Sequence, residues 1–273
     1  MDFGFGFGFA GQQEVTTGGG DPLAGIPFAL RLQTHNGNNV PLGLYQDTAC
    51  TIPATMDGDL IAGIQWVFAS GNLRLTQSDP QCQAMLVFFD GVPAIYPDGV
   101  DDFYESSSVT LSTAVSIFAL AARPWTNRSN YHALIAHGLV DAGNSGVKIA
   151  ITGPGALDWI AGDILGFGDG SDVVQSPRAI GPVPVLSDDG FHVITIRLGV
   201  GIANIRLDGS SISSRIENSG VLPSEAGAYY VGANFQGAGQ QWDGPIIAIL
   251  VTEQIISGTD LNLIEAYLAT LKP

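Results

Sequence analysis

The sequence predicts an all-β domain, an antiparallel sandwich or barrel that ends in one helix. The chain is rich in turn residues: 36 glycines and 15 prolines among 273 residues make almost one residue in five, where about one in eight is usual. Between the turns lie short runs of β-branched and aromatic residues, which are typical of strands. Many short strands separated by turns indicate a sandwich or a barrel. With 45% hydrophobic residues, the chain is too apolar to be disordered.

Residues 1–20 are predicted to form an extended arm. Phenylalanine and glycine alternate there, with the rings at Phe3, Phe5, Phe7 and Phe9. A period of two places all four rings on one face of an extended strand. The intervening glycines give that strand no side-chain support, so its rings would face water unless they docked elsewhere. We therefore expect a docking arm followed by a hinge at Gly18–Gly20; the alternative is a low-complexity tail.

Residues 21–84 are predicted to form a short-stranded leader region that packs on the sandwich. Its apolar runs are separated by the turn signals Asn36-Gly37, Asp57-Gly58 and Ser70-Gly71-Asn72. From residue 85 onward the strand pattern is sharper, with runs of four to nine apolar residues bounded by Gly, Pro, Asp or Asn. We expect residues 85–273 to be the main domain.

The C-terminal segment breaks the strand pattern and predicts an amphipathic helix. Apolar residues recur there at steps of three and four, at Leu261, Ile264, Leu268 and Leu271. Ser257 and Asp260 have the spacing of a capping box, and Lys272 lies at the negative end of the helix dipole. This helix is expected to lie on a sheet.

The charge pattern excludes some partners. The net charge is −16, and the two lysines, Lys148 and Lys272, are far apart in the sequence, so no basic surface for a phosphate backbone is predicted. No window of 18 or more apolar residues exists, so membrane insertion is not expected. The chain starts Met1-Asp2-Phe3 and its first basic residue is Arg31, which is unlike a secretory signal. Without export, reduced thiols are favoured over a bridge between the two cysteines, Cys50 and Cys82.

Several stretches of the second half follow one another in a recognisable order: Asp98–Phe103, Thr113–Pro124, Asp189–Ile196, Ala203–Gly209, Tyr230–Asn234, Trp242–Val251 and the helix Leu261–Leu271. Together they resemble the laminin-G-like jelly-roll domains of the concanavalin A-like lectin/glucanase superfamily, in their bacterial and phage form. The resemblance covers about residues 85–273 and implies an antiparallel jelly-roll sandwich. Leu250 stands where the family has an acidic residue, and Phe191 stands where it has a tryptophan.

The sequence lacks the catalytic motif of the related glucanases, E-x-D-x-x-E. Only six glutamates exist, and no two are closer than eight residues. Retaining hydrolysis needs two carboxylates about 5–5.5 Å apart. His132 and His137 are five apart on a predicted strand, which points them to opposite faces, and His192 is expected to be a half-buried, hydrogen-bonded residue. We therefore expect no enzymatic activity.

Binding chemistry is predicted at acidic loops and aromatic side chains. Oxygen-rich loops suit Ca²⁺, and the resemblance implies calcium at the rim of the sandwich, with Asp101 and Asp102 the preferred ligands; simple turn chemistry is the alternative. Four aromatic residues either stack on glycan rings or pack in the core: Trp125, Tyr131, Trp159 and Trp242.

A sandwich of this kind without an export signal fits a bacteriophage virion, whose proteins are made in the host cytoplasm and exposed after lysis. The first hypothesis is a virion surface protein, a tail-fibre-like appendage or a head decoration. Its arm would bind other virion proteins or copies of itself, giving a homo-oligomer, and its sandwich would contact host glycans. The alternatives are a secreted carbohydrate-binding or cell-adhesion module and, as a minor possibility, a glycan hydrolase.

Overall fold

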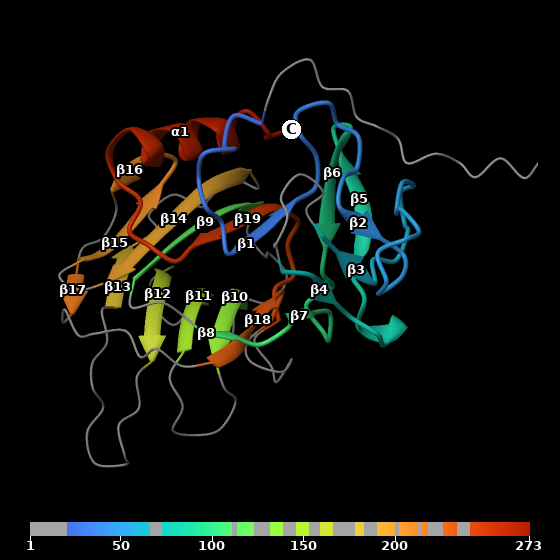
Figure 1. Ribbon diagram of the computed structural model, residues 1–273, viewed down its shortest axis with the longest axis horizontal. Helices are drawn as coiled ribbons and strands as arrows, with labels where there is room; N and C mark the ends of the chain where they lie inside the picture. Colours follow the sequence, from blue (N-terminus) through green and yellow to red (C-terminus); the bar gives the residue numbers. More distant parts are fainter. Residues whose placement is uncertain are drawn as a thin grey trace, which may run out of the picture.

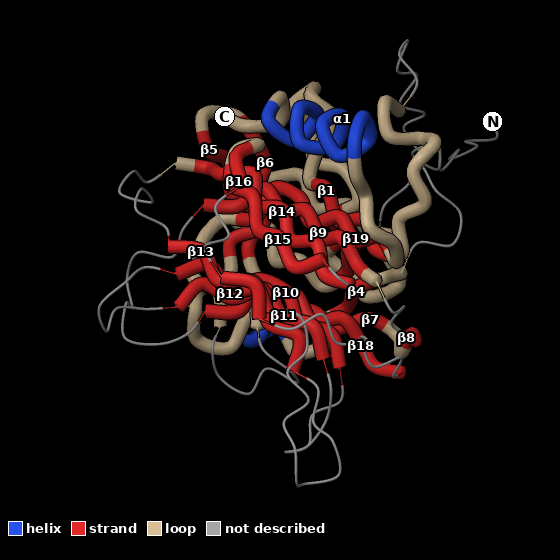
Figure 2. The backbone as a smooth tube through the Cα atoms, turned by 90° about the vertical axis from the view of Figure 1, so that its left-hand side faces the viewer, coloured by secondary structure: helices blue, strands red, loops and turns tan. Residues whose placement is uncertain are grey.

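The structure is a computed structural model of the chain, and it describes residues 21–65, 73–110, 114–122, 132–138, 146–152, 159–165, 178–182, 190–199, 202–211, 215–217, 226–233 and 241–273. In these residues the strands form two antiparallel sheets stacked as a sandwich, with one α-helix near the C-terminus (Figures 1 and 2). The predicted all-β class, the sandwich and the single C-terminal helix are confirmed. The predicted arm lies outside the described residues.

Sheet A contains the strands that support the helix. Its order is β16 (Ser210–Ser211), β15 (Ile202–Leu207), β14 (Phe191–Gly199), β9 (Val115–Ala122), β19 (Ile246–Thr252), β6 (Val92–Tyr96) and β5 (Met85–Phe89), with β1 (Leu30–Gln33) beside β19.

Sheet B forms the opposite layer. Its order is β17 (Arg215–Glu217), β13 (Arg178–Pro182), β12 (Trp159–Leu165), β11 (Gly146–Thr152), β10 (His132–Gly138), β18 (Ala226–Val231), β7 (Tyr104–Ser106), β4 (Leu75–Thr76), β3 (Gly63–Ile64) and β2 (Leu44–Tyr45), with β8 (Val109–Thr110) beside β18. A short 3₁₀ turn, η1 (Pro80–Cys82), precedes β5.

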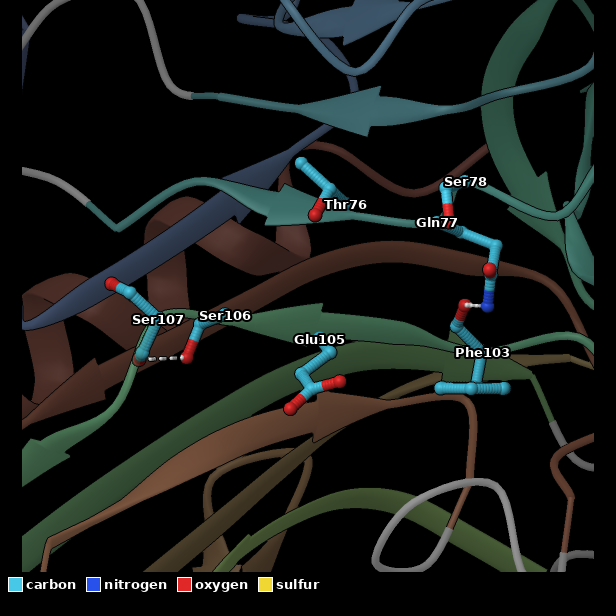
Figure 3. Close-up of a pocket in the computed structure, with 7 residues that line it drawn as sticks. All are labelled: Thr76, Gln77, Ser78, Phe103, Glu105, Ser106 and Ser107. Carbon is cyan, nitrogen blue, oxygen red and sulfur yellow. Dashed lines mark hydrogen bonds between the residues drawn. The ribbon is translucent and has the colours of Figure 1, made fainter.

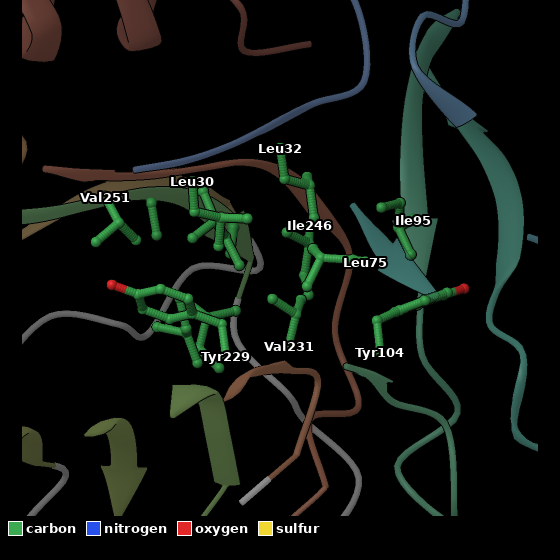
Figure 4. Packing of buried hydrophobic residues seen from close by; sticks show 14 of the residues in the cluster. Leu30, Leu32, Leu75, Ile95, Tyr104, Tyr229, Val231, Ile246 and Val251 are labelled. Carbon is green, nitrogen blue, oxygen red and sulfur yellow. The ribbon is translucent and has the colours of Figure 1, made fainter. Parts of the chain in front are cut away.

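The main core fills the space between the sheets (Figure 4). Strand β9 shows why its sequence is apolar throughout. Ile117 and Ala119 face the inter-sheet core, whereas Phe118 and Leu120 face the opposite side and pack under the helix. Side chains alternate along a strand, and here both faces are covered, so all eight residues are buried. Each large side chain buried in this way contributes roughly 1.5–3 kcal/mol.

Helix α1 (Gly258–Ala269) covers the outer face of sheet A (Figures 1 and 2). Leu261, Ile264 and Leu268 are buried in the cluster that contains Phe118, as the periodicity predicted. Two details differ from the prediction. Ser257 holds the N-cap position without a side-chain capping hydrogen bond, and the helix ends before Lys272.

Residues 21–84 contribute strands to both sheets. Strand β1 pairs with β19 from Leu30, opposite Val251, to Gln33, opposite Ala248. Strand β4 pairs with β7, and β3 and β2 extend sheet B beyond it. The β4–β7 contact positions the candidate site described below.

In the described part of the chain, no helical segment has the length and apolar character that crossing a membrane requires. Both cysteines, Cys50 and Cys82, are free thiols with partly exposed side chains.

Candidate functional site

A pocket of about 350 Å³ opens on sheet B where β4 and β7 lie side by side (Figure 3). Its described lining is polar apart from one ring: Thr76, Gln77, Ser78, Phe103, Glu105, Ser106 and Ser107. Proteins bind small ligands in hollows of about 300–1,000 Å³ that combine apolar walls with a few polar groups. The pocket is therefore the candidate binding site of this molecule.

Strand alternation creates the pocket. Thr76 lies opposite Glu105 across the β4–β7 ladder, and both side chains belong to the outer face. Tyr104, the residue between Phe103 and Glu105, points inward and is fully buried, and its hydroxyl donates to the Ile61 carbonyl oxygen at 2.9 Å. A buried tyrosine with a satisfied hydroxyl anchors β7, so Phe103 and Glu105 face outward together.

Hydrogen bonds hold the edges of the pocket in place. The Gln77 side-chain amide donates to the Phe103 carbonyl oxygen at 3.0 Å, which ties the residue after β4 to the residue before β7. The Ser106 hydroxyl donates to the Ser107 carbonyl oxygen at 2.8 Å and accepts from the Tyr229 N–H at 2.9 Å. These hydrogen bonds hold Phe103 and Ser106 in place, and Glu105 lies between them in the chain.

Glu105 and Tyr230 form a polar pair beside the pocket. The Tyr230 hydroxyl donates to Glu105 Oε1 at 3.0 Å. Burial and this hydrogen bond raise the pKa of Tyr230 to about 12, so the phenol stays protonated and remains a donor. Phe103 is partly buried and packs against Tyr230, Ala136 and Ala228. The pocket thus offers an aromatic surface next to an exposed carboxylate.

A cluster of acidic side chains lies at the Phe103 end of the pocket. Ligand atoms of Asp98, Asp101 and Asp102 all lie within 4.8 Å of one another. The Phe103 N–H donates to the Cys82 carbonyl oxygen at 3.3 Å. Burial and, in order, the carboxylates of Asp101, Asp79, Asp102 and Asp98 raise the pKa of the Cys82 thiol. Asp102 directly precedes Phe103, so the cluster and the pocket are neighbours along the chain.

Asp102 is the buried member of the cluster, with 4% of its surface exposed. Its Oδ2 accepts a hydrogen bond from the Asp98 N–H at 2.8 Å. Burial raises the pKa of Asp102 to about 6; the charges of Asp98 and Asp101 add to this effect and the Asp98 hydrogen bond opposes it. Three carboxylates of this kind have the donor chemistry of a calcium site, which needs six to eight oxygens.

A second group of charged side chains lies between α1 and the β14–β15 hairpin, where a pocket of about 310 Å³ opens. Glu265 Oε1 accepts from Arg206 Nε and from the Thr195 hydroxyl, each at 2.8 Å. Asp208 pairs with His192 Nδ1 at 2.6 Å and with Lys272 Nζ at 2.8 Å. His192 is hydrogen-bonded, as predicted. Lys272 binds Asp208 rather than the helix end, because the helix stops at Ala269.

The structure brings few of the predicted site residues together. Asp101 and Asp102 lie together and are joined by Asp98. Trp242 is fully buried in the inter-sheet core; of the two placements open from the sequence, it takes the core, where its ring has no exposed face for a glycan. Trp159 begins β12, opposite Thr152 and Pro182.

The other predicted contact residues lie outside the described residues: Trp125, Tyr131, Phe3, Phe5, Phe7 and Phe9. Sequence reasoning missed Phe103, Glu105 and Tyr230 as a site. The available signal was the alternation Phe-Tyr-Glu in a short strand, which places the ring and the carboxylate on one face.

Comparison with protein-family models and with curated proteins finds no match. Solved structures do match. A GH54 α-L-arabinofuranosidase shares 15% identity, with a TM-score of 0.53, over 90% of this chain and 63% of its own. The binding domain of botulinum neurotoxin serotype G shares 14% identity, with a TM-score of 0.51, over 89% of this chain and 51% of its own. A Trypanosoma rangeli sialidase shares 9% identity, with a TM-score of 0.49, over 76% and 31%.

This chain spans less than two thirds of the length of each of these proteins. At such low identity the first two matches show the fold alone: a β-sandwich that is similar to those of an arabinofuranosidase and of a toxin binding domain. The narrower resemblance to laminin-G-like domains of phage type has no matching family model and stays a prediction.

The expectation of no enzymatic activity is wrong as an inference from this sequence. It rested on the missing E-x-D-x-x-E motif, but an α-L-arabinofuranosidase has a similar sandwich at 15% identity. Catalytic carboxylates on such a fold need not follow one strand motif, because residues distant in sequence meet in space. The fold is shared with an enzyme, so the missing motif does not decide whether this chain is one.

Proposed function

We propose that this chain binds glycans through the pocket formed by Phe103 and Glu105. The observation that carries the proposal is the lining: one partly buried ring beside a carboxylate, an amide and several hydroxyls. A sugar ring has an apolar C–H face and an edge of hydroxyl groups. Aromatic side chains that present an apolar surface next to polar groups suit such ligands. The matches in fold to a glycan-acting enzyme and to a toxin binding domain agree with a lectin-like module.

In its finer form, the proposal places the chain on the surface of a bacteriophage particle, as a tail-fibre-like appendage or a head decoration. The alternating Phe/Gly arm of residues 1–20 supports it, since an extended segment with rings on one face suits strand addition to a sheet edge. Other virion proteins or copies of this chain would be the partners, and a host glycan the ligand. A secreted carbohydrate-binding module is the alternative, and it shares the same pocket.

Calcium is the proposed cofactor. Asp98, Asp101 and Asp102 would supply oxygen ligands, and a bound divalent cation would offset the repulsion among the three carboxylates. Phe103 directly follows Asp102, so an ordered acidic turn would hold the ring in place.

The glycan proposal is tested with Phe103→Ala on a glycan array and by titration calorimetry. Loss of the stacking surface is expected to weaken binding roughly tenfold or more. Phe88→Ala is the matched control, because Phe88 is also partly buried against the core but lies outside the pocket. Equal binding by both variants and the parent chain would mean that the glycan does not bind in this pocket. A reducing-end assay on every bound glycan measures hydrolysis in the same experiment.

The virion proposal is tested by removing residues 1–20. Mass photometry and co-sedimentation with purified particles compare the full chain with the shortened one. Assembly or attachment that disappears with the arm supports the proposal. Two monomers that attach to nothing contradict it and leave the secreted module as the better explanation.

A further inference from the structure

The proposed glycan pocket carries one kind of charge. Among the described residues that line it, Glu105 is the only charged side chain, and it is exposed. Its hydrogen-bond donor is the neutral hydroxyl of Tyr230, so its negative charge is not neutralised by that contact. The remaining lining groups are hydroxyls, an amide and a ring, which carry no charge.

The acidic cluster directly precedes Phe103 in the chain, and it adds negative charge to this region as long as no cation is bound to it. Ligand oxygens of Asp98, Asp101 and Asp102 lie within 4.8 Å of one another. The Phe103 N–H donates to the Cys82 carbonyl oxygen, and burial, together with these three carboxylates and Asp79, raises the pKa of the Cys82 thiol.

Arg74, the described basic residue nearest in sequence to the pocket lining, is turned away. It immediately precedes β4 and lies two residues before Thr76, on the same side of the chain. Its guanidinium donates to Gln65 Oε1 at 3.1 Å and to the Thr48 carbonyl oxygen at 3.3 Å. Gln65 directly follows β3, and β3 lies on the side of β4 opposite to β7. Arg74 is therefore directed toward β3 rather than into the pocket.

Sheet register places Lys148, the next basic residue along the described row, far across the face. The row through the pocket runs from Glu105 to Tyr230, then Ala136, then Lys148. Neighbouring strands lie about 4.8 Å apart, so three strand spacings put the Lys148 backbone about 14 Å from that of Glu105. This exceeds the screening length of about 8 Å at physiological salt.

We infer that the pocket selects uncharged glycans and rejects sialylated, sulfated or uronate-bearing ones. This inference rests on the proposed function. An anionic sugar on the Phe103 ring would meet the Glu105 carboxylate, with no cation in the described lining to pair with, and like-charge contacts oppose binding. A neutral sugar instead offers hydroxyl donors that Glu105 accepts.

The test compares matched neutral and acidic glycans on the full chain: lactose with sialyllactose, and glucose-based with glucuronate-based oligosaccharides. We expect the neutral member of each pair to bind at least about tenfold more tightly at low salt. Glu105→Gln is expected to reduce this preference several-fold, since it removes the charge and keeps the shape. Glu253→Gln, an exposed substitution of equal charge outside the pocket, should leave the preference unchanged.

Each outcome has a separate meaning. Acidic glycans that bind the parent chain as tightly as their neutral partners would overturn the inference while supporting the glycan site. A preference that Glu105→Gln and Glu253→Gln alter equally would also overturn it, because the effect would then come from net charge. If no glycan of either kind binds, the proposed function fails and the inference fails with it.

Discussion

Asp102 provides the sharpest test of the acidic cluster, because its burial makes folding depend on pH. The pKa rises from 3.8 to about 6 on folding. Below the lower value the carboxyl is protonated in both states. Between the two values the folded chain keeps a proton that the unfolded chain has released, so stability falls as pH rises through this window. Above about pH 6 the full cost of about 3 kcal/mol is present.

The perturbation is Asp102→Asn, which keeps an oxygen that accepts the Asp98 N–H and removes the ionisation. Since the sequence pI is near 4.2, the measurement starts at about pH 5. The parent chain should lose about 1.4 kcal/mol of stability from this group between about pH 5 and 7.5, and the variant should not. Relative to the parent, the variant therefore gains that amount as pH rises.

The assay is urea unfolding of both chains across this pH range, followed by tryptophan fluorescence. Asp59→Asn is the control, because Asp59 is partly exposed and hydrogen bonds from Met56 and Thr55 lower its pKa. A stability difference between the Asp102 variant and the parent that stays constant from pH 5 to 7.5 would refute the reasoning about burial.

Three further predictions follow from other contacts. Glu265→Ala leaves the Arg206 guanidinium without its partly buried partner and should cost about 3–5 kcal/mol in urea unfolding; an unchanged midpoint would contradict a structural role for the pair. Gly99→Ala should lower the melting temperature more than Gly91→Ala, since both glycines have positive φ but only a Cβ at Gly99 would clash with Asp243 Cβ. Equal melting temperatures for the two variants would contradict that packing. Calcium should raise the melting temperature at pH 7.5, reversed by a chelator and absent in a variant that lacks the acidic cluster; no shift at millimolar calcium would end the calcium proposal.

Local pattern was sufficient for the elements whose structure depends on near neighbours. The helix over α1 followed from apolar residues at steps of three and four, and strand β9 followed from a run with no charged residue. The helix end did not follow, because Lys272 has a partner at Asp208, 64 residues away, and a long-range ion pair leaves no local signal.

The pocket depended on contacts between distant segments. Thr76, Glu105 and Tyr230 come from three strands whose register brings them to one face. The same holds for Trp242, whose aromatic character fits both a glycan contact and a core residue until the packing of the two sheets decides between them.

By itself, the sequence determined the all-β class, the closing helix and the acidic, turn-rich character of the chain, because composition and short periodicities act through local backbone preference. Only the tertiary structure decided which face of sheet B is open, that Phe103 and Glu105 share a pocket, and that Asp98 joins Asp101 and Asp102 around a buried carboxyl. These features arise from strand register and from burial. Both depend on which distant segments meet, and no local pattern encodes that choice.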